Sequence, residues 1–242
     1  MYYEYMTAIV RGLNRICSED QTALEQAAAF AGKTLAEDGL IYLFGCGHSH
    51  MLAEEGFYRA GGLGAVCPIL ATEVMLHEGA VKSSRLERRA DLAEDILDRY
   101  PISEKDTLIV FSTSGINGMA IETARLARKK GCAVIGVSSG AYNEDASRHP
   151  EGLRLRDVCD VWIDNGAPHG DASYPIMGTQ GNMAPVSTIF GSYILNCVLA
   201  RGAEICVSGG VIPKIYVSGN VEGGFEKNAT LIQQYRGRIR SL

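Results

Sequence analysis

The sequence predicts a three-layer α/β/α sandwich with a doubly wound, mostly parallel, five-stranded sheet. Five short apolar runs lack the polar alternation of a half-exposed strand, which is typical of strands buried on both faces. Stretches with helical spacing separate these runs, and many of the 28 glycines lie at turns from a strand into a helix. Strands that alternate with helices in this way indicate an open parallel sheet covered on both faces. The five runs are residues 40–44, 65–70, 107–111, 132–137 and 158–163.

The helices around the sheet follow from the spacing of apolar side chains. Residues 1–38 predict two consecutive helices, because side chains such as Ile9, Leu13 and Ile16 recur at helical intervals. The region after residue 201 is rich in glycine turns and predicts a wrapping tail that ends in a short helix near 228–235. We expect one domain, residues 1–242, with N-terminal helices (1–38), an α/β core (40–201) and a C-terminal tail (202–242). Further helices are expected at 50–60, 86–97, 117–130 and 186–201.

Composition and charge exclude several classes of protein. The formal net charge is −5 and the basic residues are scattered, so no nucleic-acid partner is expected. No apolar run approaches the roughly 20 residues of a membrane-spanning helix, so no membrane partner is expected either. The start of the chain lacks the pattern of a secretory signal, and the seven cysteines form no C-x-x-C pair. These features predict a cytoplasmic protein.

The first turn that can carry chemistry follows the run at 40–44. It places Gly47, His48 and Ser49 at the carboxyl end of a buried strand, where open parallel sheets bind ligands. Glycines allow a tight turn, and Ser49 can cap the next helix, whose N-terminus attracts anions. The competing hypothesis of a dinucleotide site is disfavoured, because a G-x-G-x-x-G motif would need glycine where His50 stands.

The second turn follows the run at 107–111 and is rich in neutral hydrogen-bond donors. Ser112, Thr113 and Ser114 precede Gly115, and Asn117 stands at the start of a helix. Hydroxyl and backbone N–H groups at a helix N-terminus can hold a phosphate without any lysine. The structural alternative uses one of these residues as a helix cap and leaves the others idle. Because two such turns belong to one sheet edge, we favour a phosphate site.

The two turns, in order with the segment 127–137, resemble the sugar isomerase (SIS) domain family. That family has a G-x-G-x-S turn, an S-x-S-G turn and then a helix that ends in A-x-x-x-G before an apolar strand. The resemblance covers residues 41–201 and implies a flavodoxin-like fold, in which Ser112, Thr113, Ser114 and Asn117 hold the phosphate of a sugar phosphate. It also implies contact of Ser49 with the sugar or its phosphate, and a homodimer or homotetramer. The family includes phosphoheptose isomerases and N-acetylmuramic acid 6-phosphate etherases.

Aldose–ketose isomerisation through an enediol needs a base, a proton shuttle and no cofactor. The segment 71–79 is similar to the A-E-x-x-H-G stretch of sugar-phosphate isomerases, with Glu73 and His77 in the matching roles. Glu78, followed by Gly79 and Ala80, is similar to the E-G-A segment of the etherases. The structural alternative is an exposed helix on which Glu73 and His77 form a solvated pair.

Three further groups of residues are candidates for a catalytic or binding role. Glu55 lies on the helix after the first turn and is a weaker candidate for the base. His169 and Asp171 follow the fifth apolar run and can contact sugar hydroxyls or shuttle a proton, although turn chemistry also explains them. His48, His50 and Glu54 have some of the spacing of a metal site, but no third ligand cluster accompanies them, so no metal is expected.

These observations predict an enzyme that binds a phosphorylated sugar and isomerises it, as a phosphoheptose isomerase does. A glutamate (Glu73, Glu78 or Glu55) is the expected base, with assistance from His77 or His169. Two alternatives stay open. One is a lyase that cleaves an ether of an amino-sugar phosphate, and the other is a non-catalytic sugar-phosphate sensor.

Overall fold

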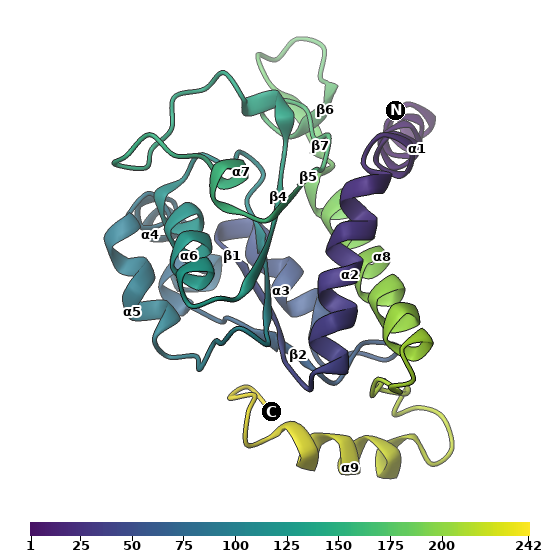
Figure 1. Ribbon diagram of the computed structural model, residues 1–242. Helices are drawn as coiled ribbons and strands as arrows, with labels where there is room; N and C mark the ends of the chain where they lie inside the picture. Colours follow the sequence, from purple (N-terminus) through teal and green to yellow (C-terminus); the bar gives the residue numbers. More distant parts are fainter.

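A five-stranded parallel sheet forms the centre of the computed structural model, which describes residues 1–242 (Figure 1). Its strand order is β2-β1-β3-β4-β5, and every neighbouring pair is parallel. All residues of β1 and β3 are buried, as the continuous apolar runs predict. The strands are β1 (Ile41–Gly45), β2 (Val66–Pro68), β3 (Thr107–Phe111), β4 (Ala133–Ser138) and β5 (Val161–Asp164). The three-layer, doubly wound fold class is confirmed.

Helices cover both faces of this sheet (Figure 1). One face carries α2, α3 and α8, with α1 packed outside them, and the other carries α5, α6 and α7. α4 lies beside the short helical turns that follow β2, and α9 lies below the sheet near the C-terminus (Figure 1). The bounds are α1 (Tyr2–Glu19), α2 (Gln21–Ala36), α3 (Met51–Gly56), α4 (Ala80–Leu86), α5 (Ala93–Leu97), α6 (Gly118–Lys129), α7 (Leu155–Val158), α8 (Ser187–Ser208) and α9 (Gly224–Tyr235).

Two segments differ from the sequence predictions. The expected helix at 86–97 is interrupted, because α4 ends at Leu86, Arg89 is extended and α5 begins only at Ala93. The N-terminus of α6 packs against this interruption, where Met119 N–H donates to Glu87 O at 3.0 Å. The second difference is an antiparallel hairpin of β6 (Ala172–Pro175) and β7 (Asn182–Pro185), which had no signal in the sequence.

α8 is longer and more apolar than expected. Its 22 residues are long and apolar enough, by length and composition alone, to span a membrane. In the structure α8 packs against α2 along its length and places Ile194, Leu195 and Val198 in the hydrophobic core. A helix that is apolar on most of its surface is typical of such a buried position. The expectation that no segment reaches this length was therefore wrong, whereas the contacts of α8 are those of a core helix.

α2 and α8 cross where glycine allows their backbones to touch. A Cβ atom on Gly202 would lie 2.8 Å from Ala31 Cβ and 3.2 Å from both Ala28 O and Gly32 N. Two of these neighbours are backbone atoms that cannot move without displacing α2. The crossing therefore needs glycine at position 202.

We predict that Gly202→Val separates α2 from α8 and lowers the free energy of unfolding by about 1–3 kcal/mol, the usual effect of overpacking. Urea unfolding monitored by circular dichroism measures this change. The matched control is Ala200→Val, because Ala200 is exposed on the same helix. Equal midpoints for the two variants would contradict the assigned crossing.

Candidate functional site

A cavity of about 560 Å³ opens at the carboxyl ends of β1 and β3. The strand order reverses between these two strands, and the helices that follow them, α3 and α6, lie on opposite faces of the sheet. Open α/β sheets bind ligands at such a switch point, because the diverging loops leave a crevice. Both turns selected from the sequence line this cavity, which we call the switch-point pocket.

The first loop enters the pocket directly after β1. Residues 46–49 line it, so Gly47, His48 and Ser49 stand together at the edge of the sheet. Gly47 has a φ of +57°, in the left-handed region that favours glycine. This turn directs the short 3₁₀ helix Gly47–His50 into α3.

The second loop faces the first across the pocket. Ser112, Thr113, Ser114 and Asn117 line the cavity. Gly115 has a φ of +64° and lies against Ser138, behind the lining side chains. The turn therefore brings three hydroxyl groups to the N-terminus of α6, as the sequence predicts.

Several hydrogen-bond donors of the second loop have no partner within the protein. Asn117 is the N-cap residue of α6, yet its side chain makes no capping hydrogen bond. The backbone N–H groups of Thr113 and Ser114 donate to no backbone carbonyl. By contrast, Ser139 at the end of β4 donates to Ala167 O at 2.5 Å. The loop therefore lacks the side-chain helix cap that the structural alternative expects of Asn117.

Three charged residues that the sequence analysis did not select also line the pocket: Glu87, Arg148 and Asp145. Arg148 donates from Nη1 to Asn117 Oδ1 at 2.7 Å, and both of these side chains lie near the Glu87 carboxyl group. Burial raises the pKa of Glu87, while Arg148, Arg88 and the Asn117 side chain oppose that rise. Glu87 is thus a carboxyl group whose pKa lies above its ordinary value, inside a cavity.

Packing of α6 brings Glu87 to this position. A Cβ atom on Gly118 would lie 2.8 Å from Arg88 O and 3.1 Å from Ala90 N, so only glycine allows α6 to begin against the 87–90 turn. Arg148 comes from the long loop after β4, where its own N–H donates to Ile116 O at 2.8 Å. Neither residue belongs to a recognisable motif, so sequence reasoning had no signal for them.

His169 and Asp171 lie at the opposite rim of the pocket. The His169 ring stacks on Tyr142, and its Nε2 atom is 3.0 Å from Asp145 Oδ2. The Asp171 carboxylate instead accepts hydrogen bonds from the N–H groups of Val186 and Ser187 and from the Ser187 hydroxyl. Asp171 therefore fixes the start of α8. This structural role explains the position of the Asp171 side chain without any contact to a ligand.

The other candidate catalytic residues lie outside the switch-point pocket. Glu73 pairs with Arg99 at 2.7 Å, and the hydrogen bond from this guanidinium lowers the pKa of Glu73. Glu78 pairs with Lys82 at 3.4 Å, and His77 is exposed beside it. Glu55 on α3 pairs with Arg59. Within this chain the carboxyl group of raised pKa that lines the pocket is therefore that of Glu87 and not one from these positions.

Two further features bear on the chemistry of the pocket. Burial raises the pKa of the Cys46 thiol, so Cys46 lines the pocket as a neutral group and not as a nucleophile. His50 Nε2 lies 3.0 Å from Glu54 Oε1, and burial lowers the pKa of His50. No third histidine, cysteine, aspartate or glutamate joins this pair in a cluster suited to a metal ion.

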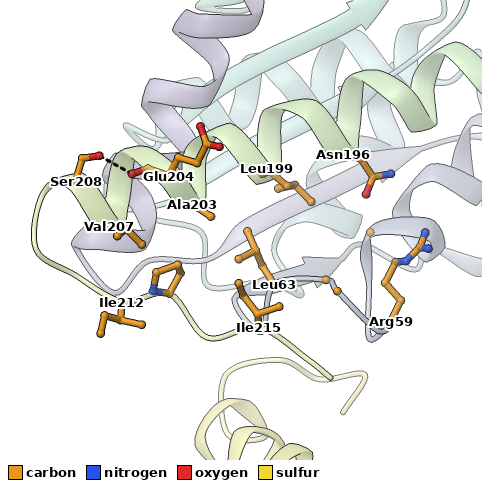
Figure 2. A pocket seen from close by; sticks show the side chains of 15 residues that line it. Arg59, Leu63, Asn196, Leu199, Ala203, Glu204, Val207, Ser208, Ile212 and Ile215 are labelled. Atoms are coloured by element: carbon orange, nitrogen blue, oxygen red, sulfur yellow. Dashed lines mark hydrogen bonds between the residues drawn. The ribbon is translucent and has the colours of Figure 1, made fainter. Parts of the chain in front are cut away.

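A second cavity, of about 680 Å³, lies between the C-terminal half of α8 and the tail (Figure 2). Figure 2 shows Leu63, Leu199, Ala203 and Ile215 along its walls, with Arg59 and Glu204 at opposite ends. Its lining has no cluster of hydroxyl groups and no histidine. The polar and titratable groups that acid–base chemistry needs gather instead at the switch-point pocket.

Comparison with known proteins supports this arrangement. The model of the SIS domain family matches residues 4–139. A UPF0309 protein of Listeria innocua serovar 6a is 42% identical over 243 residues, which cover 100% of this chain and 98% of the relative. A UPF0309 protein of Thermoanaerobacter pseudethanolicus is 39% identical over 247 residues, the full length of both.

One solved structure shares the fold at low sequence identity. The phosphoheptose isomerase of Francisella tularensis superposes with a TM-score of 0.57 at 15% identity, covering 84% of this chain and 96% of that one. The family model matches more than half of the chain, and it includes both loops that line the switch-point pocket. The chain therefore belongs to the SIS domain family.

Proposed function

We propose that this protein binds a phosphorylated sugar in the switch-point pocket and interconverts its aldose and ketose forms. The observation that carries the proposal is the combination of unused donors and a half-buried carboxyl group, that of Glu87, in one cavity. Ser112, Thr113 and Ser114 face Ser49 across the crevice, and Glu87 lies beside them. The fold is shared with a phosphoheptose isomerase, so it is compatible with this chemistry.

The second loop and the first loop hold the phosphate in this proposal. The hydroxyl groups of Ser49, Ser112, Thr113 and Ser114 donate to phosphate oxygens, together with the free N–H groups of Thr113 and Ser114. The positive end of the α6 dipole adds to this attraction. Holding the phosphate fixes the reacting carbons relative to the catalytic groups, which assists the rate as well as the affinity.

Glu87 then supplies the acid–base chemistry. Its carboxylate removes the proton from the carbon next to the carbonyl, and an enediol forms as the carbonyl oxygen takes up a proton. Return of the proton to the neighbouring carbon completes the isomerisation. His169, paired with Asp145, or His48 from the first loop moves the proton between the two oxygens. The cycle consumes no cofactor.

The subunit state is also part of the proposal. α1 exposes Tyr2, Tyr3, Met6 and Val10 to solvent, and an exposed apolar stripe of this kind marks an interaction surface. We propose that α1 contributes to a homodimer or homotetramer. A second copy can also bring Glu55, Glu73, His77 or Glu78 toward a neighbouring pocket.

Removal of a second-loop hydroxyl group is expected to weaken sugar-phosphate binding. Hydrogen bonds to charged groups contribute about 1.5–3 kcal/mol each, so Ser112→Ala and Ser114→Ala each weaken sugar-phosphate binding by roughly 10- to 100-fold. The measurement is the rise in thermal midpoint with a panel of hexose and heptose phosphates. The control is Ser147→Ala, because Ser147 is on the Arg148 loop but outside the pocket. Unchanged affinity in both loop variants would overturn the proposed site.

Replacement of Glu87 separates binding from turnover. Because general acid–base catalysis contributes about 10²–10⁴-fold, Glu87→Gln is expected to lower the isomerisation rate by that factor while sugar-phosphate binding persists. Aldose–ketose conversion is followed with the sugar phosphate that stabilises the protein most, and Glu94→Gln on exposed α5 serves as control.

Two outcomes would contradict this assignment. A comparable loss in Glu55→Gln, Glu73→Gln or Glu78→Gln, with Glu87→Gln active, would move the base to that residue. Tight binding without turnover of any sugar phosphate by the unmodified protein would favour a sensor.

A further inference from the structure

Glu87 stands between the two loops that hold the phosphate in the proposed function. Its Oε2 atom is 4.0 Å from the position that a Cβ atom on Gly47 would occupy, so the carboxyl group lies next to the first loop. Asn117 of the second loop lines the same cavity and lies near this carboxyl group. An anion held by both loops is therefore an immediate neighbour of Glu87.

Two like charges in one cavity are unfavourable unless one is neutralised, because a partly enclosed site screens their repulsion less than bulk water does. The lining of the pocket has one cationic side chain, Arg148, and no lysine. One of its Nη1 hydrogen bonds already goes to Asn117. Arg148 alone cannot offset both a carboxylate and a dianion.

The other groups that face Glu87 do not remove this conflict. Arg88 is the second cation near its carboxyl group, but it lies outside the pocket lining. Cys46 is a neutral thiol, and His48 belongs to the first loop. Across the pocket, Asp145 is paired with His169. Asp171, engaged with the start of α8, adds further negative charge at that rim.

We propose that the switch-point pocket takes up phosphate together with one proton, and that the Glu87 carboxyl group receives this proton. The proposal rests on phosphate binding at this pocket, as described above. A proton from solvent adds to a carboxylate oxygen and forms an O–H group, and no other bond is made or broken. The neutral carboxyl group can then donate a hydrogen bond to the anion instead of repelling it. The ionised form, which acts as the base in the proposed function, returns as pH rises toward the pKa of the complex.

The electrostatics of the empty site favour this coupling. Burial already raises the pKa of Glu87 above its ordinary value, so little free energy is needed to protonate it. A bound dianion raises the pKa of Glu87 further. The affinity for the anion is therefore highest below the pKa that Glu87 has in the free protein. It falls as pH rises from that pKa to the pKa that Glu87 has in the complex, and it is constant at higher pH.

Arg148 sets the pH range over which Glu87 takes up the proton. Its positive charge opposes the rise in the pKa of Glu87, and its hydrogen bond orients Asn117 between the two groups. Arg148 is thus a positioning residue for Glu87 as well as a cation for the ligand. Without it, the pKa of Glu87 rises and the pH dependence of binding moves upward.

The coupling is tested on the intact protein by the stabilisation that anions produce at different pH values. Thermal midpoints are measured from about pH 5 to about pH 8 in sodium sulfate and in sodium chloride of equal ionic strength. Sulfate is a dianion throughout this range, so any proton taken up belongs to the protein. The same series is run with the best sugar phosphate, for which comparison with Glu87→Gln cancels the titration of the ligand.

In the unmodified protein, stabilisation is expected to fall as pH rises, by up to tenfold in affinity per pH unit between the two pKa values. Glu87→Gln removes this dependence and binds at least as tightly at the upper end of the range. Arg148→Gln weakens binding overall and moves the dependence to higher pH. The controls Glu94→Gln and Arg85→Gln, both exposed, are expected to match the unmodified protein.

The results distinguish the two proposals. An identical pH dependence in the unmodified protein and in Glu87→Gln would overturn the proton coupling while phosphate binding stands. If neither sulfate nor any sugar phosphate stabilises the protein at any pH, the proposed function itself fails. If Glu87→Gln alters the melting temperature in chloride, the comparison of sulfate with chloride within that variant still isolates the ligand effect.

Discussion

The reversal of strand order between β1 and β3 is the constraint on which the site depends. Because the connections of a parallel sheet are right-handed, α3 and α6 leave the same edge of the sheet toward opposite faces. The loops that precede α3 and α6 must diverge, and a crevice remains between these two loops. The switch-point pocket follows from that geometry, and Ser49 and Ser112 line it from the two loops that precede these helices.

A second constraint is the balance of charge inside this crevice. Neutral donors dominate the two loops, which suits an anion that is surrounded by oriented dipoles. One carboxyl group and one guanidinium then enter from elements outside the loops. Arg148 bonds to Asn117 and opposes the rise in the pKa of Glu87, so in the proposed coupling the protonation of Glu87 responds to the charge that the pocket holds. Acid–base chemistry and anion binding thus share the same few side chains.

The surfaces away from the pocket have a different character. α1 exposes an apolar stripe, and the cavity beside α8 has mostly apolar walls (Figure 2). Both lie on the side of the sheet that carries α2 and α8. Ion pairs lie on both sides of the sandwich, for example Lys130 with Asp98 on the α5–α6 side and Arg201 with Glu25 between α8 and α2. The exposed apolar stripe of α1 is therefore the feature that supports the proposed assembly through this side.

The amino-acid sequence alone was enough to identify the strands, their parallel arrangement and the two loops. These features arise from local periodicity and from glycines and hydroxyls at fixed offsets, which neighbouring residues largely determine. Ser112 to Asn117 therefore appear in the pocket as expected. The sequence analysis also expected a continuous helix at 86–97 and no hairpin at β6–β7. Packing against α6 interrupts the helix, and the Asp171 carboxylate, which accepts a hydrogen bond at the start of α8, helps to place the hairpin.

Tertiary structure alone decided which charged groups reach the pocket. Glu73 and His77 are four residues apart and look like an acid–base pair, but Arg99 holds Glu73 outside the cavity. Glu87 enters only because Gly118 lets α6 pack against its turn, and Arg148 enters only because a loop after β4 folds back over Ile116. Such contacts join residues about 30 positions apart along the chain, and no local pattern encodes them. The sequence located the two loops proposed to bind an anion, and the packing of distant segments determined which charged side chains lie beside them.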